Sequence, residues 1–173
     1  DRILVTAEPF GLWVIESDRD ISSDLPLPQC GLPVIYTDNQ KPYKQRKVRI
    51  LNGAHTSFVP AAFQCGHDIV LTAMNDELIL NFMQKTLYDE VIPTLALPKE
   101  DLMAFAEAVT GRFKNPFIKH ALLSICLNSV SKWRARCMPS LLGYVEKTGE
   151  LPARLTFSLA SLMSLYRGGK LVD

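Results

Sequence analysis

The fold is decided within residues 47–65, which read KVRILNGAHTSFVPAAFQC. The apolar side chains in this stretch recur every three or four residues, which places them on one face of an α-helix. They are Val48, Leu51, Ala54, Phe58 and Ala62. Pro60 predicts a kink or a break, because proline removes a backbone hydrogen bond, and Gly66 predicts the end of the helix.

Helical spacing continues toward the C-terminus. Asn75 is a predicted N-cap for a helix that ends near Val91, and a second helix is predicted over residues 102–113. Pro116 predicts the start of a third helix, which is expected to end near Pro139. It would bury one face made of Phe117, Ala121, Leu122, Ile125 and Val130.

The last predicted helix covers Pro152–Arg167 and is apolar almost all round, which predicts a central, buried position. Gly168 and Gly169 would end it.

Residues 1–40 have a different pattern. Two short runs rich in aromatic and β-branched residues, 10–15 and 33–37, predict strands joined by a polar, proline-containing loop. Two strands do not form a stable sheet alone, so they are expected to pack on the helices or to join other strands. The expected fold is mainly α, with five or six helices over residues 41–173 preceded by this β segment.

Composition restricts the possible functions. The chain has 173 residues, 47% of them hydrophobic, and a net charge of +1, so a core is expected and a nucleic-acid or membrane-surface partner is not. No stretch predicts a membrane span or a signal peptide. The scattered cysteines form no Cys-x-x-Cys pair and predict free thiols in the cytoplasm. They are Cys30, Cys65, Cys126 and Cys137.

Three polar residues of the first helix are candidates for catalysis. On an α-helix, Asn52 lies about 140° and His55 about 80° around the axis from Lys47, so the three fit one broad arc. A lysine in its neutral form accepts a proton from an alcohol and returns it to a carbonyl, while Asn52 and His55 offer hydrogen bonds to the reacting oxygen. Such a site needs no metal. The same spacing also occurs on ordinary surface helices, and Asn-Gly is common in turns.

The pattern Lys47-x4-Asn52-x2-His55 resembles the signature of the polyol-specific long-chain dehydrogenases, the mannitol dehydrogenase family. Residues 8–16, EPFGLWVIE, resemble the stretch that enters the second domain of that family. Further stretches resemble its tagaturonate reductase (altronate oxidoreductase) branch: KPYK at 41–44, LNGAHT at 51–56, GRFKNPFIKH at 111–120 and LPARLTF at 151–157.

The resemblance implies a multi-helical domain like the C-terminal domain of 6-phosphogluconate dehydrogenase, and a sugar acid or polyol as substrate. It implies that Lys47 is the general acid/base and that Asn52 and His55 stabilise the reacting oxygen. Sugar-alcohol members carry an arginine eight residues before a lysine. Here the lysine matches Lys132 and the arginine position is Ser124, which favours a different substrate, such as one with a carboxylate.

His120 and Lys132 are candidate substrate contacts, although each is equally well explained as a solvated or structural residue. Tagaturonate/altronate is the expected substrate pair, followed by fructuronate/mannonate and mannitol/fructose.

The cofactor that the resemblance implies is NAD, bound by a covalently linked N-terminal Rossmann-like domain. No Gly-x-Gly-x-x-Gly motif occurs in this chain. The sequence begins at Asp1 without a methionine, so we expect a piece of a longer enzyme, inactive alone and with Lys47 exposed.

Two other hypotheses remain at this stage. The basic cluster Lys41, Lys44, Arg46, Lys47 and Arg49 would serve a non-enzymatic helical interaction module as a partner surface, or would be a solvated helix start. His55, Cys65 and His67 would form a metal site, although their spacing matches no standard ligand pattern.

Overall fold

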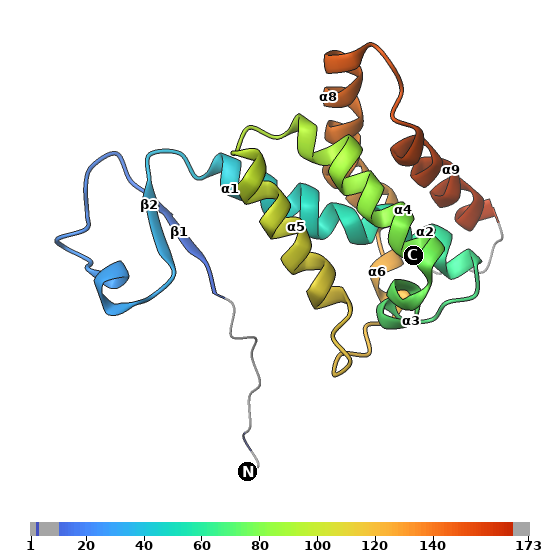
Figure 1. Cartoon of the computed structure of the whole chain (residues 1–173), viewed down its shortest axis with the longest axis horizontal. Coiled ribbons are helices and arrows are strands. Elements are labelled where there is room, and N and C mark those ends of the chain that lie inside the picture. The colour runs from blue at the N-terminus through green and yellow to red at the C-terminus, as the bar shows by residue number, and fades with distance from the viewer. Residues whose placement is uncertain (1–2, 4–10, 168–173) are drawn as a thin grey trace. The chain divides into compact units, whose positions relative to one another are not determined.

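The computed structural model describes residue 3 and residues 11–167, and the chain divides into two units, residues 1–44 and 45–173 (Figure 1). In the first unit, β1 (Trp13–Glu16) pairs in parallel with β2 (Val34–Thr37), with Trp13 opposite Val34. Both strands lie where the sequence predicted them, although Phe10, at the start of the first predicted run, lies outside the described residues.

The loop between the strands contains the 3-10 helix η1 (Leu27–Cys30), which ends at Gly31 with a φ of 73°. The Tyr36 hydroxyl of β2 donates a hydrogen bond to the Leu25 carbonyl and so ties this loop to the sheet. At the end of β1, the Glu16 carboxylate accepts a 2.8 Å hydrogen bond from the Gln40 backbone.

All the remaining elements of the described chain are helices. In chain order they are α1 (Lys41–Arg46), η2 (Lys47–Asn52), α2 (Gly53–Gln64), α3 (Val70–Asn75), α4 (Glu77–Lys85), η3 (Thr86–Val91), η4 (Ile92–Thr94), α5 (Lys99–Phe113), α6 (Leu122–Cys126), α7 (Ser129–Arg136), α8 (Met138–Thr148) and α9 (Ala153–Arg167). Two of these, η2 and η3, are π-helical. The mainly α fold is confirmed, although the described residues form more helices than the five or six expected.

The centre of the helical unit is α2, which packs against α4, α6, α7 and α9. Figure 1 shows α2 crossing the unit behind α4. Ala54, Phe58 and Ala62 are fully buried, as their spacing predicted. No break occurs at Pro60, since α2 continues through it to Gln64. Gly66 follows the helix with a φ of 93°, which confirms the predicted end.

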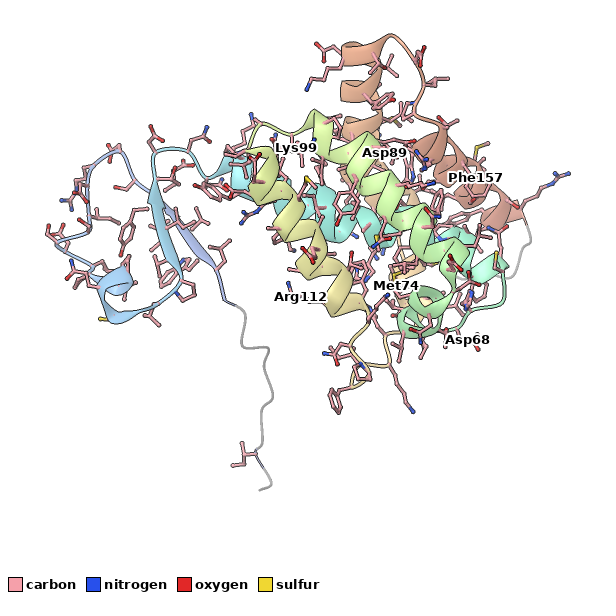
Figure 2. The ribbon with its side chains drawn as sticks, viewed as in Figure 1. Asp68, Met74, Asp89, Lys99, Arg112 and Phe157 are labelled. Atoms are coloured by element: carbon pink, nitrogen blue, oxygen red, sulfur yellow. The ribbon has the colours of Figure 1, made fainter. Side chains whose placement is uncertain are left out.

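The predicted central position of the last helix is wrong. One side of α9 packs on α2, but Phe157 is 55% and Met163 67% exposed. Figure 2 shows Phe157 on α9, where its ring contacts Phe82 edge-on at 5.5 Å between centroids. The predicted end at Gly168 and Gly169 lies outside the described residues.

The prediction of one helix from Pro116 to Pro139 is also wrong. Residues 114–121 are not helical. The chain first turns, with Ile118 N bonded to Asn115 O, and residues 120–122 then pair with residues 68–70: Val70 N donates to His120 O at 2.9 Å and Leu122 N to Asp68 O at 2.8 Å. Phe117 is consequently 93% exposed.

The rest of that predicted helix also differs from the prediction. Asn128 adopts a left-handed conformation with a φ of 55° and separates α6 from α7. Val130, predicted to be buried, is 60% exposed. Pro139 lies in the first turn of α8, where proline fits, so it begins a helix instead of ending one.

Carboxylates cap two helices. The N-cap of α4 is Asp76 and not the predicted Asn75, because the Asp76 side chain accepts hydrogen bonds from Leu78 N and Ile79 N. Glu90 of η3 is 2% exposed, and its carboxylate accepts hydrogen bonds from the backbone N–H groups of Arg154 and Leu155, each at 2.8 Å. It thereby caps the start of α9.

The four cysteines form no disulfide with one another. In the described part of the chain, no helix is long and apolar enough to cross a membrane.

Candidate active site

The predicted catalytic residues begin on a π-helical turn. η2 covers Lys47–Asn52, and the Gly53 N–H bonds back to the carbonyl of Val48, five residues earlier. In a π-helix the hydrogen bonds join residues five apart, so one turn holds more residues than the roughly 3.6 of an α-helix. Lys47 and Asn52 therefore lie closer to one side than the α-helical estimate of about 140° gave. Single π-turns within α-helices occur frequently at functional sites.

The three residues differ in their environment. Lys47 is exposed, and its side chain forms no hydrogen bond or ion pair with the residues that the structure describes. Asn52 and His55 are half-buried, and the Asn52 Oδ1 and His55 Nε2 atoms are buried without a hydrogen-bond partner. An unsatisfied buried polar atom costs about 1–3 kcal/mol, so two of them three residues apart call for an explanation, and a ligand provides one.

The His55 ring is enclosed by aromatic groups. It stacks on Phe113 at 4.0 Å between centroids and meets the edge of His120 at 5.4 Å. Burial, most of all, together with the nearby His120 and the positive charge of Arg136, lowers the pKa of His55 to about 3. The imidazole is therefore neutral at physiological pH, with one ring nitrogen as a donor and the other as an acceptor.

The two predicted substrate contacts have different surroundings. His120 is exposed and lies against His55, so the structure brings these two residues together. Lys132 is half-buried on α7, where its Nζ donates a 3.0 Å hydrogen bond to the Ile125 carbonyl. Ser124 is exposed and its hydroxyl donates to the Ala121 carbonyl at the start of its own helix.

Sequence reasoning missed a group of residues that hold the π-helical turn. Arg136 donates from Nη1 to the Thr56 hydroxyl at 3.2 Å, and Thr56 donates in turn to the Asn52 carbonyl at 2.9 Å. The Cys137 thiol donates to the Gly53 carbonyl, with 3.6 Å between sulfur and oxygen. Burial raises the pKa of Cys137 to about 12, so the thiol keeps this proton.

A second arginine connects the turn itself to α8, because Arg49 Nη1 donates to the Ser140 hydroxyl at 3.0 Å. Only Arg136 could have been found from the sequence, because its four-residue spacing from Lys132 puts both side chains on one side of a helix. The partners of Arg49 and Arg136, about 80 to 90 residues away, left no such signal.

The alternative sites are not assembled. His67 contacts the Asp76 carboxylate at 3.2 Å and Cys65 is exposed. Within residues 11–167, no group of three or more histidine, cysteine or acidic side chains is placed to hold a metal. The basic cluster is also divided, because Arg46 lies over the Phe105 ring at 4.7 Å and Arg49 bonds to Ser140.

The profile of the mannitol dehydrogenase C-terminal domain matches residues 39–170. Altronate oxidoreductases from Enterobacter sp. (strain 638) and Escherichia coli O7:K1 (strain IAI39) are 55% and 54% identical to this chain over 168 residues. These matches cover 97% of this chain and 35% of each relative, so the chain spans about a third of the length of these curated relatives.

Two solved structures share the fold. One is Pseudomonas fluorescens mannitol 2-dehydrogenase in a ternary complex with NAD and D-mannitol, 26% identical, with a TM-score of 0.75 over 92% of this chain and 32% of that chain. The other is a D-sorbitol dehydrogenase in substrate-free form, 25% identical, with a TM-score of 0.79 over 91% of this chain and 32% of that chain.

Proposed function

Because this chain belongs to the mannitol dehydrogenase C-terminal domain family, we propose that it is the substrate-binding and proton-transferring part of an NAD-dependent sugar-acid dehydrogenase. The observation that carries the proposal is the pair of buried, unpartnered atoms on the π-helical turn and the start of α2, Asn52 Oδ1 and His55 Nε2. These atoms offer hydrogen bonds to a hydroxyl or carbonyl group in a place where the protein itself supplies no partner.

Lys47 is the proposed general acid/base. During oxidation its neutral amine takes the proton of the substrate hydroxyl, and during reduction its ammonium returns a proton to the carbonyl oxygen. NAD, when bound, accepts or supplies the hydride of the same carbon. His55, neutral because of its burial, donates from Nε2 to the reacting oxygen, and the Asn52 amide accepts from a substrate hydroxyl.

The residues of this chain fit the reacting end of the substrate better than the nucleotide. One of the two unpartnered atoms is a carbonyl oxygen, which does not bind a phosphate, and the sequence contains no Gly-x-Gly-x-x-Gly motif. We therefore assign nucleotide binding to a covalently linked N-terminal domain of the complete protein, and expect the 173-residue chain alone to be inactive. The NAD complex of the mannitol 2-dehydrogenase supports this choice of cofactor.

Tagaturonate/altronate is the proposed substrate pair, since relatives named altronate oxidoreductase match at 54–55% identity. The test is a panel of tagaturonate, fructuronate and fructose with NADH and the full-length protein. Tagaturonate is expected to give the highest kcat/KM. A higher value for fructuronate would correct the substrate, and no turnover with any of them would favour the non-enzymatic interaction module.

A further inference from the structure

Two cations on α7 have no acidic partner. Lys132 and Arg136 are both half-buried, and their four-residue spacing places them on one side of the helix. Within residues 11–167, neither forms an ion pair with a carboxylate: Lys132 bonds to a backbone carbonyl and Arg136 to the Thr56 hydroxyl.

The half-buried arginines differ in their partners: Arg49, like Arg136, bonds to a hydroxyl group, whereas Arg154 is paired with carboxylates. The Arg154 side chain, 32% exposed, lies 3.3 Å from the Asp89 carboxylate and 3.4 Å from that of Glu90. Removing a cation from water without a counter-charge is unfavourable, which is why partly buried arginines are generally paired. The neutral surroundings of Arg136 are therefore a feature that requires a cause.

Arg136 lies beside the candidate active site. Its partner Thr56 follows His55 directly and bonds to the Asn52 carbonyl, so one chain of hydrogen bonds connects the guanidinium to the residues that would hold the reacting oxygen. Its positive charge also acts on the His55 ring. The bond to Thr56 occupies one of the five guanidinium N–H groups and fixes the orientation of the planar group, which leaves N–H groups for an anion.

We propose that Arg136 binds the carboxylate of the substrate, with Lys132 adding positive charge beside it, and that this contact selects sugar acids over neutral sugars. The proposal rests on the proposed function and identifies a specificity determinant for it. Arginine suits this role because its planar N–H groups match the two oxygens of a carboxylate.

The test compares two substrates of the full-length protein with NADH: tagaturonate, and the neutral ketohexose that carries a hydroxymethyl group in place of the carboxylate. Arg136→Met is expected to lower kcat/KM for tagaturonate about 10- to 100-fold, the effect typical of losing a hydrogen bond to a charged group. The value for the neutral ketohexose should fall by a much smaller factor, because this substrate has no carboxylate to lose and is affected only through the hydrogen bond from Arg136 to Thr56. Arg136→Lys keeps the charge without the planar group and should retain part of the activity on tagaturonate.

The matched control is Arg134→Met, which removes an exposed arginine from the same helix and should leave both values unchanged. If Arg136→Met does not fold, Arg136→Lys serves as the test. The proposal then requires kcat/KM to fall more with tagaturonate than with the neutral ketohexose. An equal loss with both substrates would show a purely structural role, and undiminished activity with tagaturonate would overturn the proposal. Wild-type protein without activity on any sugar acid would instead refute the proposed function.

Discussion

At the scale of single residues, His55 is the most perturbed group of the site. It is enclosed by Phe113, Phe58 and His120, and its Nε2 atom is buried without a partner. These surroundings disfavour the charged form, so the ring remains a neutral hydrogen-bonding group at any pH at which the enzyme is expected to work.

This leads to a prediction for titration. Because the pKa of His55 is lowered from 6.5 to about 3, its ring should keep the NMR chemical shifts of neutral imidazole at pH 5, where an ordinary histidine is largely protonated. The measurement is a pH titration of the protein with labelled histidine, and His55→Gln identifies the signal by its disappearance. A His55 signal that titrates near pH 6.5 would contradict the described burial.

The sign of the linked stability change follows from the same pKa. Between about pH 6.5 and pH 3 the unfolded chain binds a proton at His55 that the folded chain does not. His55 therefore favours unfolding progressively as the pH falls through this range, and its contribution is absent above pH 6.5.

At the scale of elements, carboxylates from one element cap another. Glu90 of η3 holds the first backbone N–H groups of α9, whose own first turn contains no acidic residue. This contact connects two helices that are more than 60 residues apart in the chain.

We predict that Glu90→Ala lowers the free energy of unfolding by about 1–3 kcal/mol, because it leaves the buried Leu155 N–H and its neighbour without an acceptor. The matched control is Asp89→Ala, which removes an exposed carboxylate from the same arginine and should cost less than about 1 kcal/mol. Urea unfolding of both variants measures the difference. Equal effects would show that the cap contributes no more than a surface ion pair.

The elements also show which features a sequence can predict. The core face of α2, the strands and the ends at Gly66 and near Val91 follow from local spacing and from glycine and proline, and the structure has them. The error at Pro116 arises where distant contacts decide, because residues 120–122 pair with residues 68–70 and no local pattern contains that information. The error at Pro139 is local, since proline fits the first turn of a helix as well as it ends one.

The candidate site divides in the same way. One short motif predicts Lys47, Asn52 and His55 as site residues. It does not predict the π-helical turn from Lys47 to Asn52, because the same residues form an α-helix equally well. Arg136 and Thr56 were missed because their contact joins positions 80 residues apart.

At the scale of the whole molecule, α2 contributes to both the hydrophobic core and the candidate active site. One face of this helix is the fully buried centre of the helical unit, and its first turn carries His55 and Thr56. α7 packs on the same helix, and its last residue, Arg136, and the following Cys137 both bond to the first turn of α2. The core thus fixes Asn52 and His55 in place, while the Lys47 side chain is exposed.

The central claim is that Lys47 transfers the proton, and the most direct measurement is kcat of full-length Lys47→Ala with NADH and tagaturonate. We predict that kcat falls at least about 100-fold, the usual effect of losing a general acid/base, while the unfolding midpoint stays unchanged because the side chain is exposed. Lys85→Ala, which removes an exposed lysine from the last turn of α4, should keep wild-type activity. Wild-type kcat in Lys47→Ala would contradict the account.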